Sequence, residues 1–420
     1  MISKALRIAT VAVIALFINA CQLPTFSTAT DSSGNGNDLV KGQLQPAGFL
    51  SFNDFVTEVY NTSDPDEKMA LVDSFMTWAQ ATTGIPYLED STRVIFLLCS
   101  STISSAAVAG DFNGWDPANQ DFTRLSGTDL YYRMETFEPS ARLDYKLVLD
   151  GSQWILDPLN PNTCAGGFGP NSELAMPHYI QPPEIQQHDI PHGTVSAELF
   201  TDSQETTHDL QIYLPPGYAV TNDSFPIAYF HDGSEWLDLA YAQNTLDYLI
   251  HYQEIQPVIG VFVDPNDRNQ DYSYDYAYLS MFSDELVPWI EPQYRIKQGS
   301  ANRATIGVSL GGLTSLLFSI QRPDVFGNCG TFSPAIWFGD ISEQYESAAE
   351  INTKIYLDSG TYEPTIYQAT QSMAGLLDER NATYVNKIWH EGHSWGAWRA
   401  HLDEALTFFW PVEMTGIAPE

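Results

Sequence analysis

The spacing of hydrophobic residues changes along this chain. Between residues 49 and 82 they recur at helical intervals, as Phe52 and Phe55 illustrate, and Asp64 is placed to cap a second helix. From about residue 92 the period becomes that of short β-strands, at 93–98, 106–109, 130–136 and 143–149. Short strands at this spacing predict a β-sandwich.

Further along, strands alternate with helices. The predicted strands are 210–214, 227–230, 258–263, 305–308, 354–357 and 385–389, and the predicted helices include 245–252, 279–290 and 311–321. This alternation predicts an α/β domain with a mostly parallel sheet covered on both faces. A loop rich in Gly, Pro and Asn precedes it, so we place domains at 48–190 and 191–415.

The first twenty residues have the pattern of an export signal. Lys4 and Arg7 precede an apolar run that is too short to span a membrane, and Cys21 follows a small residue. This arrangement resembles a bacterial lipobox and predicts lipidation of Cys21, the alternative being an ordinary cleavable signal. In similar lipoproteins a residue such as Gln22 implies sorting to the outer membrane. Residues 21–47 are polar and predict a flexible tether.

The charge balance excludes several functions. Lys and Arg number 18 and Asp and Glu 53, a formal net charge of −35, so the basic footprint of a nucleic-acid binder is missing. We therefore expect an exported protein whose only membrane attachment is its lipid. In an oxidising compartment Cys99 and Cys164 can pair, whereas Cys329 lies in an apolar strand and is expected to be a buried thiol.

The strongest chemical signal is the run Gly307-Val308-Ser309-Leu310-Gly311, which follows a predicted strand and opens a predicted helix. That is the context of a G-x-S-x-G nucleophile elbow, in which the serine is presented on a sharp turn. The alternative is a glycine-rich helix start with a solvated serine.

A serine nucleophile needs a base, and in this fold the acid and the histidine follow it in the chain. His393 lies in a loop beyond the last predicted strand, whereas we interpret His390 and His401 as structural. Two acids, Asp358 and Glu363, follow the strand at 354–357, and the pattern favours neither. The histidines fall one residue short of the H-E-x-x-H zinc motif, so no metal and no other cofactor is predicted.

For the oxyanion, we expect the amide after the nucleophile, that of Leu310, and one from the loop after the third strand, that of Ser234. Aromatic and basic side chains near the motifs are candidates for substrate binding, the alternative for each aromatic residue being core packing. They are Trp236, Arg268, Tyr272, Tyr274, Trp337 and Trp395.

At these residues a family resemblance becomes specific. Roughly residues 195–412 resemble the esterase family that includes enterochelin esterases, esterase D and feruloyl and acetylxylan esterases. The resemblance is carried by YLPPGY at 213–218, HDGSEW at 231–236, GVSLGGLTSL at 307–316, SGTYEP at 359–364 and GHSWGAWR at 392–399. It implies an α/β-hydrolase fold and, through the x-E-P piece, Glu363 as the acid.

A second resemblance concerns the predicted sandwich. The run GDFNGW at 110–115 and the later Trp154 resemble the early-set domain found beside starch-active enzymes and some esterases, often called a carbohydrate-binding module. The alternative, which we favour from sequence, is that Trp115 and Trp154 are packing residues.

Together these patterns predict a serine ester hydrolase with the triad Ser309, His393 and Glu363. Enterochelin is anionic when it carries iron, and a protein at −35 would repel it, so we expect carbohydrate-linked or other neutral esters. The alternatives are a siderophore trilactone esterase, an acyltransferase with the same triad, and a surface glycan-binding lipoprotein with a vestigial hydrolase domain.

Overall fold

The computed structural model describes residues 51–118 and 120–412, so the predicted signal peptide, Cys21 and the tether lie outside the described residues. The chain forms two compact units. The first consists of the described residues up to 108 with 118–136 and 148–154, and the second consists of 109–117, 137–147 and the chain from 155 onward. Compactness does not measure whether a segment folds on its own. The predicted boundary between independently folding domains near residue 190 therefore stays a prediction.

The first unit pairs two helices with a small antiparallel sheet. Its helices are α1 (Phe52–Asn61) and α2 (Pro65–Thr82), and its sheet has the order β1 (Tyr87–Leu88), β2 (Arg93–Cys99), β5 (Leu130–Thr136), β4 (Thr123–Arg124). Asp64 caps α2 as predicted, since its carboxylate accepts from the amides of Asp66 and Glu67. The rings of Phe55 and Phe75 stack 4.3 Å apart in the core.

Three strands cross the division between the units, namely β3 (Ala106–Gly110), β6 (Arg142–Leu149) and β7 (Gln153–Ile155). Within the second unit, the start of β6 pairs antiparallel with β9 (Asn171–Ala175), which in turn pairs with β8 (Thr163–Cys164). A 3₁₀ turn at Asp111–Asn113 follows β3.

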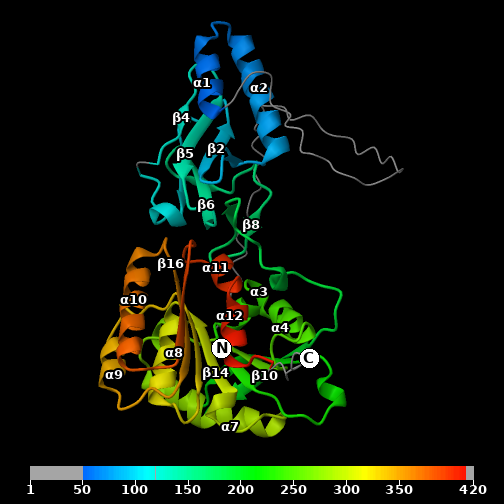
Figure 1. The fold of residues 1–420 in the computed structure, drawn as a ribbon, viewed down its shortest axis with the longest axis vertical. Helices are drawn as coiled ribbons and strands as arrows, with labels where there is room; N and C mark the ends of the chain where they lie inside the picture. Colours follow the sequence, from blue (N-terminus) through cyan, green and yellow to red (C-terminus); the bar gives the residue numbers. More distant parts are fainter. Residues whose placement is uncertain (1–50, 119, 413–420) are drawn as a thin grey trace, which may run out of the picture. The chain divides into compact units, whose positions relative to one another are not determined.

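An eight-stranded sheet forms the centre of the second unit (Figure 1). Its strands lie in the order β10 (Thr194–Thr201), β11 (Thr207–Leu214), β13 (Ile259–Val263), β12 (Ile227–His231), β14 (Arg303–Val308), β15 (Asn328–Phe332), β16 (Lys354–Gly360), β17 (Tyr384–Trp389). The six strands from β13 to β17 are parallel, and β10 and β11 are antiparallel. The predicted α/β class is therefore confirmed.

Helices cover both faces of this sheet. Successive strand residues point to opposite sides, and in the central strands both sets are apolar, so both faces need covering. In β12, Ala228 and Phe230 pack in one core, and Ile227 and Tyr229 in the other. The first core is completed by α3 (Gly233–Asp238), α4 (Ala242–His251), α11 (Trp395–Arg399) and α12 (Leu402–Phe409). The opposite face carries α6 (Tyr276–Ser280), α7 (Val287–Ile290), α8 (Leu310–Gln321), α9 (Ile341–Ser347) and α10 (Pro364–Glu379).

The predicted helix at 279–290 is interrupted. Between α6 and α7, residues Met281–Leu286 form a π-helical turn directly before Pro288. A proline has no amide hydrogen and its ring collides with the carbonyl four residues earlier, so α-helical geometry is disfavoured there. A further short helix, α5 (Arg268–Asp271), follows β13, and no helix among the described residues is long and apolar enough to cross a bilayer.

Candidate active site

Ser309 occupies the turn between β14 and α8 in a conformation that side chains rarely adopt, with φ 55° and ψ −117°. Its amide donates to the carbonyl of Phe332 on β15, and its carbonyl accepts from the amides of Leu313 and Ala335. These three backbone bonds hold the strained residue in place, and such strain is concentrated at functional sites.

The glycines around Ser309 are required by close backbone approach. A Cβ at Gly307 would lie 2.3 Å from the carbonyl of Gly311, and one at Gly312 would lie 2.8 Å from Oγ1 of Thr331. Because real Cβ atoms do not approach so closely, β14 and α8 meet at this angle only with glycine at 307.

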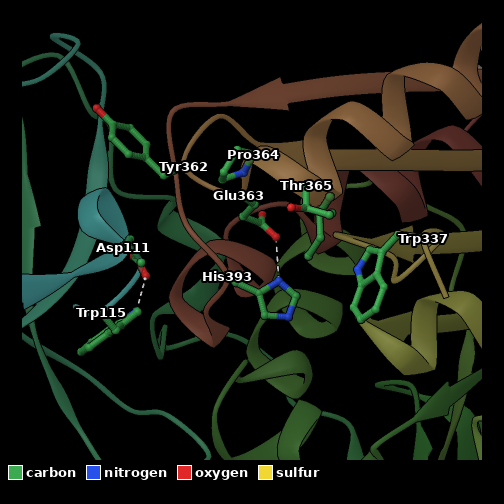
Figure 2. A pocket seen from close by; sticks show the side chains of 10 residues that line it. Asp111, Trp115, Trp337, Tyr362, Glu363, Pro364, Thr365 and His393 are labelled. Atoms are coloured by element: carbon green, nitrogen blue, oxygen red, sulfur yellow. Dashed lines mark hydrogen bonds and ion pairs between the residues drawn. The ribbon is translucent and has the colours of Figure 1, made fainter.

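Ser309, His393 and Glu363 form a hydrogen-bonded row. Nε2 of His393 lies 3.0 Å from Oγ of Ser309. On the other side of the ring, Nδ1 lies 2.6 Å from Oε2 of Glu363, the contact that Figure 2 shows as a dashed line. The side chain of His393 is 38% exposed and that of Glu363 2%, so the imidazole faces the solvent and the carboxylate is shielded behind it. The ring of Trp398 meets the imidazole edge-on, with centroids 4.8 Å apart.

The structure distinguishes the two candidate acids. Oε1 of Glu363 accepts from the hydroxyl of Ser333 and the amide of Gly360, which leaves Oε2 for His393. Asp358 instead accepts from the amide of Ser333 and the hydroxyl of Tyr356. Burial raises the pKa of Asp358 to about 7. Asp358 therefore supports Ser333, which in turn holds Glu363.

The two predicted oxyanion amides differ in availability. Leu310 is the first residue of α8, where an amide has no acceptor within the helix. The amide of Ser234 donates to Oδ1 of Asp264 at 2.7 Å. It is thus already engaged, and the arrangement corrects the expectation that Ser234 offers a free donor.

A cavity of about 450 Å³ lies beside His393 and Glu363. Trp115 and Trp337 lie on opposite sides of His393 in the view of Figure 2, and both line this cavity with Tyr362, Pro364 and other residues. Trp337 is 59% exposed. Trp115 adopts φ 63°, unusual for so large a residue, and its indole nitrogen donates to Oδ1 of Asp111.

The other predicted substrate contacts lie elsewhere. Trp236 is completely buried and Trp395 nearly so, with their rings packed against each other in the core at 5.5 Å. Arg268 forms a bidentate ion pair with Asp232, and both N–O distances are 2.8 Å. Tyr272 is buried and does not line the cavity. Tyr274 bonds to backbone atoms of Phe338 and Ile341. Trp236, Trp395 and Tyr272 are therefore core-packing residues, which was the alternative to substrate binding.

The two remaining histidines of the C-terminal part and the cysteines are structural. His401 is buried, stacks on Trp389 and pairs with Glu391, whereas Nδ1 of His390 lies 3.2 Å from Oγ1 of Thr361. The buried thiol of Cys164 donates to a backbone carbonyl, and the disulfide with Cys99 that the sequence allows is not formed. Cys329 is a buried free thiol, as predicted.

Sequence reasoning missed several residues around the site. Asp111, Tyr362 and Ser333 received no role, although Asp111 and Tyr362 lie in or beside the recognised GDFNGW and SGTYEP motifs. Burial and the neighbouring Asp144 carboxylate raise the pKa of Asp111 above its usual range. The motifs were the available signal, but only the fold brings residues 111 and 362 to one cavity.

A mostly parallel sheet with a serine elbow at the carboxyl end of a central strand defines an α/β-hydrolase. The family model described as "Putative esterase" matches residues 202–409, and the chain belongs to this family of carboxylic ester hydrolases. An iron(III) enterobactin esterase of Escherichia coli O6:H1 is 26% identical over 275 residues, which cover 61% of this chain and 68% of that protein.

Two further similarities concern another esterase sequence and a crystal structure. An endo-1,4-β-xylanase/feruloyl esterase of Xylanibacter ruminicola is 25% identical over 206 residues, 45% of this chain and 28% of that protein. The crystal structure of a ferric enterobactin esterase from Salmonella typhimurium aligns with a TM-score of 0.70 at 20% identity, covering 79% of this chain and 98% of that one. The aligned 79% of the chain includes part of the N-terminal half, so the similarity of fold extends beyond the α/β domain.

Proposed function

We propose that this protein is a serine ester hydrolase that forms an acyl-enzyme on Ser309 and acts on carbohydrate-linked or other uncharged esters. The observation that carries the proposal is the row from Ser309 through His393 to Glu363, with distances of 3.0 and 2.6 Å, beside an aromatic cavity. Each donor and acceptor in the row has the partner that acyl transfer requires.

In the first step, Oγ of Ser309 attacks the ester carbonyl carbon while Nε2 of His393 takes the hydroxyl proton. Glu363 accepts from Nδ1 and stabilises the imidazolium that forms. The tetrahedral intermediate collapses, and the alcohol leaves with the proton held by His393. A water molecule then attacks the acyl-enzyme with His393 as the base, the bond between Oγ of Ser309 and the acyl carbon breaks, and His393 returns the proton to Oγ as the carboxylic acid leaves.

The oxyanion of the intermediate is expected to accept from the amide of Leu310, which belongs to the first turn of α8. The Ser234 amide is not included, since Asp264 already accepts from it. One such donor typically contributes about 3 kcal/mol to transition-state stabilisation.

The cavity supports uncharged substrates. Among the described residues that line it there is no lysine or arginine, whereas two tryptophans and two carboxylic acids are present. Indole rings bind the flat faces of aromatic or sugar rings, and carboxylic acids repel anions. Arg268 does not change this balance, because Asp232 neutralises it.

A second candidate is a siderophore trilactone esterase, which the E. coli relative favours by its name. The two candidates differ in the charge of the substrate. We expect measurable turnover of a metal-free catecholate trilactone and at least about tenfold slower turnover of its iron(III) complex, since the latter carries negative charge into an acidic cavity. Faster turnover of the iron(III) complex would favour the second candidate.

The test of the catalytic assignment is Ser309→Ala. We expect hydrolysis of p-nitrophenyl acetate to fall by roughly 10⁴ to 10⁶ and labelling by a fluorophosphonate to disappear. Ser372→Ala is the matched control, because Ser372 is an exposed serine of α10 that bonds only within its helix. Retained turnover and labelling in Ser309→Ala would overturn the assignment.

The lipid anchor is also proposed here, from the sequence alone. Cys21→Ser should move the protein from the membrane fraction to the soluble fraction and abolish incorporation of radiolabelled palmitate. Unchanged fractionation and labelling would support the ordinary cleavable signal instead.

A further inference from the structure

Two short segments from the N-terminal half, 109–117 and 137–147, belong to the same compact unit as the triad. They are far from His393 and Glu363 in sequence, yet their side chains contact the residues directly beside both. These contacts involve the residues before and after His393 and the residue before Glu363. They are hydrogen bonds, or van der Waals contacts so close that only glycine fits.

The residue before His393 is packed on Asp111. A Cβ at Gly392 would lie 2.1 Å from Cγ of Asp111 and 2.4 Å from its Cβ, so the chain passes here only because residue 392 is glycine. Asp111 is itself buried and immobilised, because it accepts from the amide of Asp144 at 2.8 Å and from the indole of Trp115 at 3.1 Å.

The residue after His393 is held by Arg142. Its Nη1 donates to Oγ of Ser394 at 3.2 Å, and a Cβ at Gly396 would lie 2.0 Å from Nη2. The guanidinium is completely buried and is neutralised by Asp144 at 2.7 Å and Glu173 at 2.6 Å. Because both carboxylates hold the buried guanidinium in one orientation, Arg142 fixes the position of Ser394 and thereby the start of α11.

The backbone of the same segment reaches the loop as well. The amide of Arg142 donates to the carbonyl of His390 at 3.0 Å, and a parallel bridge joins Arg142 and Glu391. On the acid side, the hydroxyl of Tyr362 donates to Oε2 of Glu138 at 2.5 Å. The amide of Tyr362 donates to the carbonyl of Glu391, which links the acid and base loops.

We infer that segments 109–117 and 137–147 are part of the catalytic apparatus, in which Asp111 and Arg142 are positioning residues for His393 and Glu138 is one for Glu363. This inference rests on the proposed triad. Displacing a catalytic group by about 1 Å can cost roughly a hundredfold in rate, so contacts that fix both neighbours of the base affect turnover directly.

The test is a double-mutant cycle on kcat. Gly392→Ala should lower kcat about a hundredfold with KM changed less than about threefold, because the new methyl group displaces the loop from Asp111. Asp111→Gly should lower kcat about tenfold. The combined variant should regain at least about tenfold over Gly392→Ala, because the space for the methyl group is restored.

A second arm keeps the inference testable if Gly392→Ala does not fold. Arg142→Met with Asp144→Asn removes the buried arginine together with one of its two partners, and Glu173 keeps its ion pair with Arg399 at 3.3 Å. We expect kcat to fall at least about tenfold with secondary structure retained. The matched control is Arg303→Met with Glu291→Gln, a partly buried ion pair at the opposite end of β14, which should leave kcat within about twofold.

The outcomes separate the two proposals. Wild-type kcat in folded Gly392→Ala, or no recovery in the combined variant, overturns the positioning role. If only Arg142→Met with Asp144→Asn can be measured, equal kcat losses in this double variant and in its control overturn the role too. Failure of the proposed function is seen elsewhere, as retained turnover in Ser309→Ala.

Discussion

The two ends of the proposed triad are built in different ways. The serine end is made by six consecutive residues, 307–312, whose glycines allow β14 and α8 to meet, and by backbone bonds to the adjacent strand β15. The histidine end depends on partners far away in sequence, such as Arg142, which lies 252 residues before Ser394.

This difference separates what is encoded locally from what needs the whole fold. A strained turn that only glycines permit can be recognised in the sequence as a short motif, because the residues that the turn requires are neighbours in the chain. A loop that is positioned by a buried arginine and a buried aspartate carries no such motif. The serine end should therefore be sensitive to local changes and the histidine end to distant ones.

The largest expected effect comes from the local end. Gly307→Ala would place a methyl group 2.3 Å from the carbonyl of Gly311, so the elbow must open and Ser309 must move. We expect kcat/KM for p-nitrophenyl acetate to fall by at least about 10⁴, comparable to loss of the serine itself.

The control for this change is Gly375→Ala, also a glycine in the second unit but one with open space around it in α10. Alanine should stabilise that helix by about 0.5–1 kcal/mol and leave activity unchanged. If both variants keep wild-type activity, the elbow does not require glycine and the contrast between the two ends is lost.

The next effect concerns the acid. Glu363→Gln keeps the shape but replaces the charge that faces Nδ1 of His393, so kcat should fall by about 10³. Asp358→Asn should lower kcat less than about tenfold, because Asp358 reaches the triad only through Ser333. Steady-state kinetics of both variants, with folding checked by circular dichroism, decides between them. The reverse order would make Asp358 the functional acid.

The sequence predicted the α/β class, because the strands of a parallel sheet are nearly continuous apolar runs. The elbow motif indicated Ser309 and the loop after the last strand indicated His393, whereas only the family resemblance favoured Glu363 over Asp358. Sequence reasoning missed β10, whose residues are mostly exposed and lie at the edge of the sheet, so they lack the apolar pattern. It also joined α6 and α7 into one helix, since the apolar spacing continues through the π-helical turn.

Side-chain environments were harder to predict than strands. Trp236 comes shortly after β12, a position typical of pocket residues, but α3 turns its ring into the core against Phe230 and Phe332. Whether the Ser234 amide is free depends on Asp264, which is brought to it by β13. The contacts of Asp111 and Arg142 with the histidine loop depend on the fold of more than two hundred intervening residues.

The last expected effect is on stability and concerns Asp358, which supports the histidine end through Ser333. Burial raises the pKa of Asp358 to about 7 from an ordinary value of 3.8, so between these values the native state holds one proton more than the unfolded state. Stability must then fall as the pH rises from about 4 to about 7 and stay lower above it.

Asp358→Asn measures this contribution, because asparagine keeps a polar side chain of the same shape and cannot ionise. The free energy of unfolding of the wild type relative to this variant should decrease by up to about 4 kcal/mol between pH 4 and pH 8, the amount that corresponds to a shift of roughly three pKa units. Urea denaturation at several pH values gives this difference, and Asp238→Asn, at an exposed carboxylate, controls for loss of a negative charge. Parallel curves for wild type and Asp358→Asn would mean that Asp358 is ionised throughout.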